Sequence, residues 1–320
     1  MRRPSSLLPL MAVLLAAVSV HAASELRGTW TAGPQRDGKE FHLQLHQGQH
    51  HNMGFSEPLS AFQGLSTADG SASFTLPREA GTFSFEGNFK GGEGAGHYRF
   101  APSEAYAKAM AGLGYPKLSS EDQFKLAATD VTTTRIKDLA AAGYKNLSMD
   151  ELMQVGIFDV TPAYAQELAK AGYPGLTLEQ LVQGRIHGVT AKRVSELAGA
   201  GFPKLSWDDQ LAMNIHGVTP EYIRELRDLG FKDLDGDEIV AFRIHGVTPA
   251  FVKEMRELGF PEITDDQLVA FRIHGVTTDF VKRMRAAGYT RITPDELVSL
   301  RIHGVDETFM RAMSGAPAKK

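Results

Sequence analysis

A six-residue phrase that returns every 29 residues constrains this chain more than any other feature. Its first full form is Arg-Ile-His-Gly-Val-Thr at residues 185–190. The core of the phrase, His-Gly-Val, recurs at the same interval up to His303, with no insertion or deletion. The same register extends backward through Val160 and Val131. A fixed period of roughly 20–50 residues is typical of a repeat array, in which each unit buries its apolar face only against its neighbours.

Each repeat encodes two short helices. After the valine, Thr219 is a favoured N-cap and Pro220 a favoured first helical residue, and apolar residues follow on one helical face. Gly230 stops this first helix. A capping box opens the second helix in four repeats, with the pairs Ser148–Glu151, Thr177–Gln180, Thr264–Gln267 and Thr293–Glu296. Its apolar positions are Leu268, Val269, Phe271 and Ile273 in one repeat.

The repeats therefore predict a solenoid-like α-helical array over residues 102–313. It contains seven units and a partial eighth, residues 305–313. Neither helix of a unit can bury its apolar face alone, so stacking is required.

Residues 23–101 have a different pattern. Apolar and polar residues alternate in short runs bounded by turn residues, at 40–46, 71–76, 82–89 and 96–100, with a further short run at 28–30. Alternation with a period of two is typical of antiparallel strands. We predict a small β-meander of five to seven strands, and because about 75 residues give a thin core, we expect it to pack against the first helices. The fold class is α+β.

The two ends of the sequence lie outside both predicted domains. Residues 1–22 combine Arg2 and Arg3 with an apolar run and a small-residue cleavage site, which predicts a secretory signal peptide; a membrane anchor is the alternative. Residues 314–320 read as a disordered tail. The chain has no cysteine, so neither disulfides nor a lipoprotein anchor is expected. We predict a bacterial periplasmic or secreted protein without a membrane span after cleavage.

The repeated histidines are candidate binding residues. They are His187, His216, His245, His274 and His303. Stacked helices lie about 8–10 Å apart, whereas a zinc ion needs ligands at about 2 Å, so the ladder cannot form a metal site by itself. The alternative is that each histidine meets free carbonyls at a helix C-terminus.

Two further stretches could bind metals. His42, His46, His50 and His51 cluster in the β-rich part, where only His50 and His51 are close in sequence and remain weak candidates. Residues 233–238 imitate the start of a calcium loop, but the sixth position is Glu238 and the twelfth is Ile244. The alternative is a helix capped by Asp235. We predict no metal site and no cofactor.

An arginine of the phrase falls within the apolar arc of the second helix. An inward arginine must be paired. The first helix offers a glutamate in the same repeat, which predicts a structural ion-pair ladder with the pairs Glu167–Arg185, Glu225–Arg243 and Glu254–Arg272. Arg301 faces Arg283 and breaks this pattern.

The repeat resembles the tandem C-terminal repeats attached to some bacterial membrane metallopeptidases of the beta-lactam-sensor antirepressor type. The shared features are Gly-Val-Thr-Pro, an aromatic, a basic residue, Gly-aromatic, and then a Leu-Ser/Thr-x-Asp-Glu-Leu phrase. The resemblance covers residues 102–313, without the peptidase's zinc motif or membrane helices. The resemblance implies an envelope-associated sensing or interaction module. Proteolytic activity does not carry over, because the matching region lacks the peptidase part.

No enzyme motif is present in the sequence. It lacks His-Glu-x-x-His, Gly-x-Ser-x-Gly, a phosphate loop and a cysteine nucleophile. A net charge of −4 and predicted export argue against nucleic acid as a partner. We predict a non-enzymatic protein-interaction scaffold of the bacterial envelope that binds a protein partner through the array. The alternative is a ligand- or metal-sensing envelope protein with the β-domain as the pocket.

Overall fold

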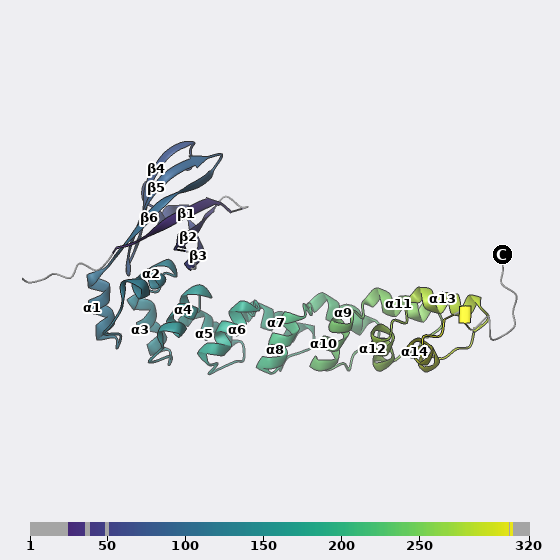
Figure 1. The fold of residues 1–320 in the computed structure, drawn as a ribbon. Helices are drawn as coiled ribbons and strands as arrows, with labels where there is room; N and C mark the ends of the chain where they lie inside the picture. The colour runs from purple at the N-terminus through teal and green to yellow at the C-terminus, as the bar shows by residue number, and fades with distance from the viewer. Residues whose placement is uncertain (1–24, 36–38, 49–50, 307, 310–320) are drawn as a thin grey trace, which may run out of the picture. The chain divides into compact units, whose positions relative to one another are not determined.

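The computed structural model describes residues 25–35, 39–48, 51–306 and 308–309, and the chain divides into two compact units (Figure 1). The first unit extends to Thr134 and the second begins at Arg135. The predicted signal peptide, residues 1–22, and the predicted tail, residues 314–320, lie outside the described residues.

The first unit contains a six-stranded antiparallel sheet, as the alternating runs predicted. Its order is β3-β2-β1-β6-β5-β4, so two three-stranded meanders join through the pairing of β1 with β6. The strands are β1 (Leu26–Pro34), β2 (Glu40–Gln47), β3 (His51–Pro58), β4 (Gly70–Arg78), β5 (Gly81–Lys90) and β6 (Glu93–Pro102). A short 3-10 helix, η1 (Leu59–Ala61), follows β3. The strand β3 was missing from the predicted runs because its sequence, HNMGFSEP, is mostly polar and contains Gly and Pro.

The core of this unit is aromatic. Trp30 is 1% exposed and packs edge-on against Phe74, with 5.3 Å between ring centroids. Helix α2 (Ser120–Ala128) covers the sheet at β1, β5 and β6. The centroid of the Phe124 ring lies 5.3 Å from that of Phe83 and 5.9 Å from that of Tyr98. The expected packing of the sheet against the first helices is therefore present. This packing also explains why the first compact unit extends past the end of the sheet.

The described residues contain fourteen α-helices in seven pairs, in agreement with the predicted seven repeats. They are α1 (Glu104–Gly112), α2 (Ser120–Ala128), α3 (Thr133–Ala141), α4 (Met149–Ile157), α5 (Pro162–Lys170), α6 (Leu178–Ile186), α7 (Ala191–Ala200), α8 (Trp207–Ile215), α9 (Pro220–Asp228), α10 (Gly236–His245), α11 (Pro249–Glu257), α12 (Asp265–Ile273), α13 (Thr278–Ala286) and α14 (Pro294–Ile302). All four predicted capping boxes are formed.

The calcium-like stretch is a helix start. The Asp235 side chain accepts a hydrogen bond from the Glu238 amide at 2.9 Å, and the Glu238 carboxylate accepts one from the Asp235 amide at 2.8 Å. Asp235 is thus the N-cap of α10, as the alternative interpretation predicted.

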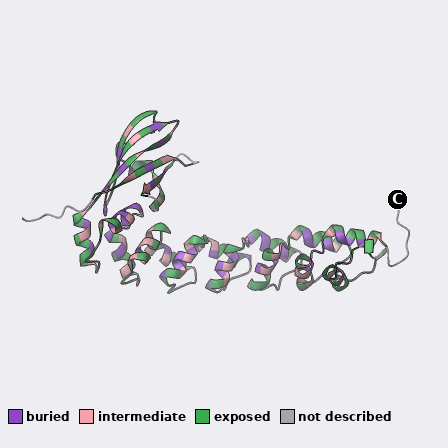
Figure 2. Ribbon diagram, in the orientation of Figure 1, coloured by how far each residue is buried: buried purple, intermediate pink, exposed green. Residues whose placement is uncertain are grey.

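In the second unit, helices of the same parity lie side by side. Odd-numbered helices contact odd-numbered ones, as α7 does α9, and even-numbered helices contact even-numbered ones, as α10 does α12 (Figure 1). The valine that starts each repeat is buried, with at most 1% exposure at each equivalent position from Val160 to Val276. Each helix carries both buried and exposed residues (Figure 2). Equivalent residues of successive repeats therefore form lines along the array.

The residue before this valine adopts a left-handed conformation at the end of each even-numbered helix. Gly246 has φ 71°, a conformation that a side chain disfavours. The first two repeats use Asp130 and Asp159 here, at φ 50° and 49°. Aspartate is among the few other residues that tolerate this region.

A candidate interaction surface on the even-numbered helices

An exposed isoleucine occupies the last turn of every even-numbered helix from α4 to α14. The side chains are 51–58% exposed: Ile157, Ile186, Ile215, Ile244, Ile273 and Ile302. Among the described residues, the other exposed large apolar side chains are Leu59 and Phe309. Because the even-numbered helices pack side by side at about 8–10 Å, these six residues form one line along the array. We call this line the isoleucine row.

The isoleucine row was not predicted. The sequence interpretation placed Ile273 among the apolar positions of its helix, together with Leu268 and Phe271. Leu268 and Phe271 are fully buried, but Ile273 is 54% exposed. At 100° per residue, Ile273 lies about 140° around the helix from Leu268, so a helical wheel would have placed it on the outer side.

An acidic row runs parallel to the isoleucine row. The second residue of each of these helices is acidic and exposed: Asp150, Glu179, Asp208, Asp237, Asp266 and Asp295. Each lies seven residues before the isoleucine, so both are on the same helix face, about 10 Å apart along its axis. An acid here also stabilises the helix through its N-terminal dipole. Each even-numbered helix thus presents an acid at its start and an isoleucine at its end.

The candidate histidines border the isoleucine row. Each directly follows an isoleucine; His187, His216 and His303 are exposed, and His245 and His274 are partly exposed. The His303 ring bonds the Ser299 carbonyl at 2.8 Å, as the helix-end interpretation predicted. For the other four, no side-chain hydrogen bond is seen in the described residues. No group of three or more metal-ligating side chains is found in that part of the chain.

The repeated arginines stack on aromatic rings. Arg185 lies 4.1 Å above the Tyr164 ring, and the equivalent distances are 4.7 Å for Arg243 on Tyr222, 4.9 Å for Arg272 on Phe251 and 5.1 Å for Arg301 on Phe280. Within the described residues, no ion pair joins these arginines to Glu167, Glu225 or Glu254. The expected glutamate ladder is thus replaced by cation–π pairs between the two helices of one repeat.

The same arginines also link successive repeats. Arg243 donates to the Gly217 carbonyl at 2.7 Å and Arg272 to the His245 carbonyl at 3.2 Å, both at the end of the preceding even-numbered helix. The C-terminal carbonyls of a helix carry partial negative charge, which favours a cation there. Arg185 instead lies 3.4 Å from the carboxylate of Asp159, which takes the glycine's place in that repeat.

A second line of arginines has the same arrangement on the odd-numbered helices. Each arginine lies over an aromatic ring of the preceding repeat, in the pairs Arg227–Phe202 (5.9 Å), Arg256–Phe231 (5.3 Å) and Arg285–Phe260 (5.4 Å). In earlier repeats alanine replaces the arginine and tyrosine the phenylalanine. There the hydroxyls of Tyr144 and Tyr173 donate to carbonyls of the next repeat at 2.9 and 3.1 Å. The two repeat positions change together, from alanine with tyrosine to arginine with phenylalanine. This paired change is visible in the sequence, but it was not used in the sequence-based predictions.

The weak metal candidates of the first unit do not converge. His42 bonds the Ser56 hydroxyl at 3.0 Å and His46 the Asn52 side chain at 2.8 Å, both between β2 and β3. His50 lies outside the described residues, and of His51 only the backbone is described, as the first residue of β3.

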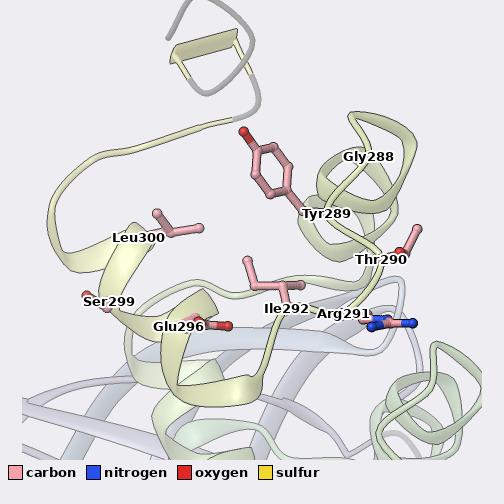
Figure 3. Close-up of a pocket in the computed structure, with 8 residues that line it drawn as sticks. All are labelled: Gly288, Tyr289, Thr290, Arg291, Ile292, Glu296, Ser299 and Leu300. Atoms are coloured by element: carbon pink, nitrogen blue, oxygen red, sulfur yellow. The ribbon is translucent and has the colours of Figure 1, made fainter. Parts of the chain in front are cut away.

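An apolar opening lies at the C-terminal end of the second unit. A pocket of about 560 Å³ is lined by residues 288–292 and by Glu296, Ser299 and Leu300. Figure 3 shows Tyr289, Ile292 and Leu300 around one open space. Tyr289 is the equivalent of Tyr144 and Tyr173, which contact the next repeat. The predicted partial eighth repeat would follow here, but residues 307 and 310–313 lie outside the described ones.

A smaller pocket of about 210 Å³ lies in the first unit between α2 and the β2–β3 edge. Leu45, Met53, Phe124 and Tyr98 are among its lining residues. The Tyr98 hydroxyl is buried and has no hydrogen-bond partner in the described structure. Burial raises the pKa of Tyr98 to about 12, so this group is neutral and can act as a hydrogen-bond donor.

None of the described helices has the length and apolar character needed to cross a membrane. Comparison with protein-family models and with curated proteins gave no match.

Proposed function

We propose that this protein is an exported, non-enzymatic scaffold of the bacterial envelope that binds a protein partner through its repeat array. The isoleucine row carries the proposal. An isoleucine that is more than half exposed gains little from burial, and its branched side chain is a weaker helix former than leucine or alanine. The fold has no need of it at six equivalent sites. A line of apolar side chains rimmed by polar ones is typical of an interaction site.

The architecture supports the same proposal. Repeat arrays present extended surfaces in which each unit contributes an equivalent contact. The polar neighbours of the row, the histidines and the acidic row, would form the rim of such an interface. The resemblance to the repeats of sensor-type metallopeptidases and the predicted signal peptide both point to the cell envelope.

Affinity capture with a row variant tests this proposal. The baits are the mature chain, residues 23–320, the double variant Ile244→Lys/Ile273→Lys, and Leu59→Lys as a matched control, each exposed to a cross-linked envelope extract. Leu59 is also an exposed large apolar residue, at 43%, but lies in the first unit. We expect one dominant partner with the mature chain and the control, and its loss with the double variant. Equal capture by all three baits would refute a role for the row.

The Tyr98 pocket favours a second candidate, a small-ligand sensor in the β-rich unit. A buried hydroxyl without a partner costs about 1–3 kcal/mol, and a bound acceptor group would remove this cost. The pocket combines apolar residues such as Leu45, Met53 and Phe124 with polar residues at its edge, a lining that suits a small amphipathic molecule with one acceptor. A small-molecule screen read by thermal shift tests it: a ligand that stabilises the mature chain but not Tyr98→Phe supports this function, and a ligand with equal effect on both argues against it.

A further inference from the structure

We infer that the isoleucine row pairs with the same row of a second copy of this chain, so that the protein is a homodimer. The inference rests on the proposed function, because it names the partner of the same surface. Exposed area, spacing and charge support it.

The exposed area fits a dimer. Six side chains that are each 51–58% exposed present together roughly 600 Å² of apolar surface, at the upper end of the patches seen on monomers. The adjoining Met153, Val269 and Val298, one turn earlier on their helices, are partly buried and widen the strip. A standard interface buries about 800 Å² on each partner. The row and its rim are therefore sufficient for a stable dimer.

The spacing of the row selects a second copy. The isoleucines recur once per repeat, about 8–10 Å apart, over six repeats. A partner that contacts every isoleucine must present apolar side chains at the same interval over the same length. An identical row satisfies this condition whatever the interval is, and a two-fold axis places the same patch on both sides of the interface.

Charge selects the orientation of the two rows. On one side of the isoleucines lies the acidic row. On the helix C-terminal side lie the histidines and three guanidinium groups, because Arg243, Arg272 and Arg301 donate to carbonyls at the C-terminal end of the preceding even-numbered helix. A two-fold axis along the row places the acids of each copy over the C-terminal side of the other. An axis across the row places acid against acid, which is repulsive. The two rows therefore run in the same direction.

Cysteine cross-linking tests both the contact and the direction, because the chain has no cysteine of its own. The variants are Ile186→Cys, Ile244→Cys and Ile273→Cys, made singly. Rows that run in the same direction bring each position next to its equivalent, so all three form disulfide-linked dimers, within the usual Cα separation of about 4.4–6.8 Å. Ser195→Cys, exposed on the odd-numbered helix α7, is the control and stays monomeric.

The outcomes separate the alternatives. Opposed rows that overlap fully place Ile215 of one copy opposite Ile244 of the other, because the axis then lies midway along the six isoleucines. Disulfide formation in a mixture of Ile215→Cys and Ile244→Cys that neither variant shows alone would overturn the same-direction arrangement. Absence of cross-linking in all three variants and in this mixture, or cross-linking of the control to the same extent, would overturn the dimer itself.

Sedimentation velocity of the full mature chain over a dilution series gives an independent test. The variant Ile244→Lys/Ile273→Lys places a cation against its own equivalent across the axis, and lysine is well tolerated near a helix C-terminus. We expect a monomer–dimer equilibrium for the mature chain, a dissociation constant raised at least about 100-fold in the double variant, and no change in Leu59→Lys. A mature chain that is monomeric throughout, or a double variant that dimerises equally well, would overturn the inference.

These results also distinguish the inference from the function beneath it. If the mature chain is monomeric but the double variant still loses a captured envelope protein, the row binds a different partner and only the homodimer is wrong. If neither self-association nor capture depends on the row, both fail.

Discussion

The pairing of Arg272 can be tested by two double-mutant cycles that share one residue. Its guanidinium carbon lies 4.9 Å from the centre of the Phe251 ring, and its Nε donates to the His245 carbonyl at 3.2 Å. Glu254, the partner expected from the sequence, forms no ion pair with it among the described residues. The cycles combine Arg272→Met with Phe251→Leu and, separately, with Glu254→Gln.

The expected coupling energies follow from this geometry. Phe251 is 6% exposed, so its truncation alone costs about 1–2 kcal/mol of packing, and Arg272→Met alone also loses the bond to the carbonyl. Both single-residue costs cancel in a cycle. What remains for Arg272 and Phe251 is the cation–π term, about 0.5–1 kcal/mol at an exposed arginine. For Arg272 and Glu254 the coupling should stay within about 0.3 kcal/mol, the usual range of additivity for groups that do not interact.

The assay must report on one repeat, because long arrays need not unfold in a single transition. Native-state hydrogen exchange of the α11 and α12 amides gives the local free energy of opening for each variant. A coupling with Glu254 that exceeds the coupling with Phe251 would refute the stacking argument and restore the ion pair. Equal and negligible couplings in both cycles would mean that neither contact stabilises the repeat.

Three further predictions concern buried tyrosines and a helix cap. Tyr222→Phe removes the hydroxyl that donates to the Val247 carbonyl at 2.6 Å and should lower the local free energy of opening by about 1–2 kcal/mol; an unchanged exchange rate in α9 and α10 would contradict it. Burial raises the pKa of Tyr98 and of Tyr164 to about 12, above an unfolded value near 10, so the folded state binds more protons between these pH values. The free energy of unfolding should be unchanged below a pH of about 10 and fall as the pH rises toward about 12. In a pH titration followed by tyrosinate absorbance, these two tyrosines should ionise after the others. Ionisation of all tyrosines near a pH of about 10 in the folded protein would argue against this. Asp235→Ala should lower the free energy of unfolding by about 1 kcal/mol, because the α10 cap is lost. Calcium should not change the melting temperature of either the parent or the variant. A rise in melting temperature with calcium in the parent alone would support a calcium loop instead.

Local chemistry made the architecture of the repeats predictable. A cap such as Thr264 with Gln267 depends only on residues three apart, and a stop such as Gly246 depends on its own backbone angle. The alternation in β2 was equally local, since Phe41, Leu43 and Leu45 all face the core. These signals place the helix starts and stops before any packing is known.

These local signals could not predict how the helices and strands pack against one another. The neighbour relation of β1 and β6 joins residues about 70 apart, and the contact of Phe124 with Phe83 draws α2 to the sheet. An arginine placed on the inner arc of a helix could be paired with an acid or with a ring, and periodicity alone does not choose between them. In the structure these arginines stack on the rings of Tyr164, Tyr222 and Phe251 and remain partly or fully exposed to water.

The 29-residue period, the caps and the glycine stops are enough to predict an α+β chain with two-helix repeats, because caps and stops act within one turn of the backbone and the period is read directly from the residues. Which side of each helix its neighbours cover depends on how the repeats stack. Leu268 and Ile273 have isomeric side chains and lie on one helix, but neighbouring helices cover Leu268 and leave Ile273 54% exposed. The isoleucine row, on which the proposed function depends, exists because burial is a property of the stacked array and not of any single repeat.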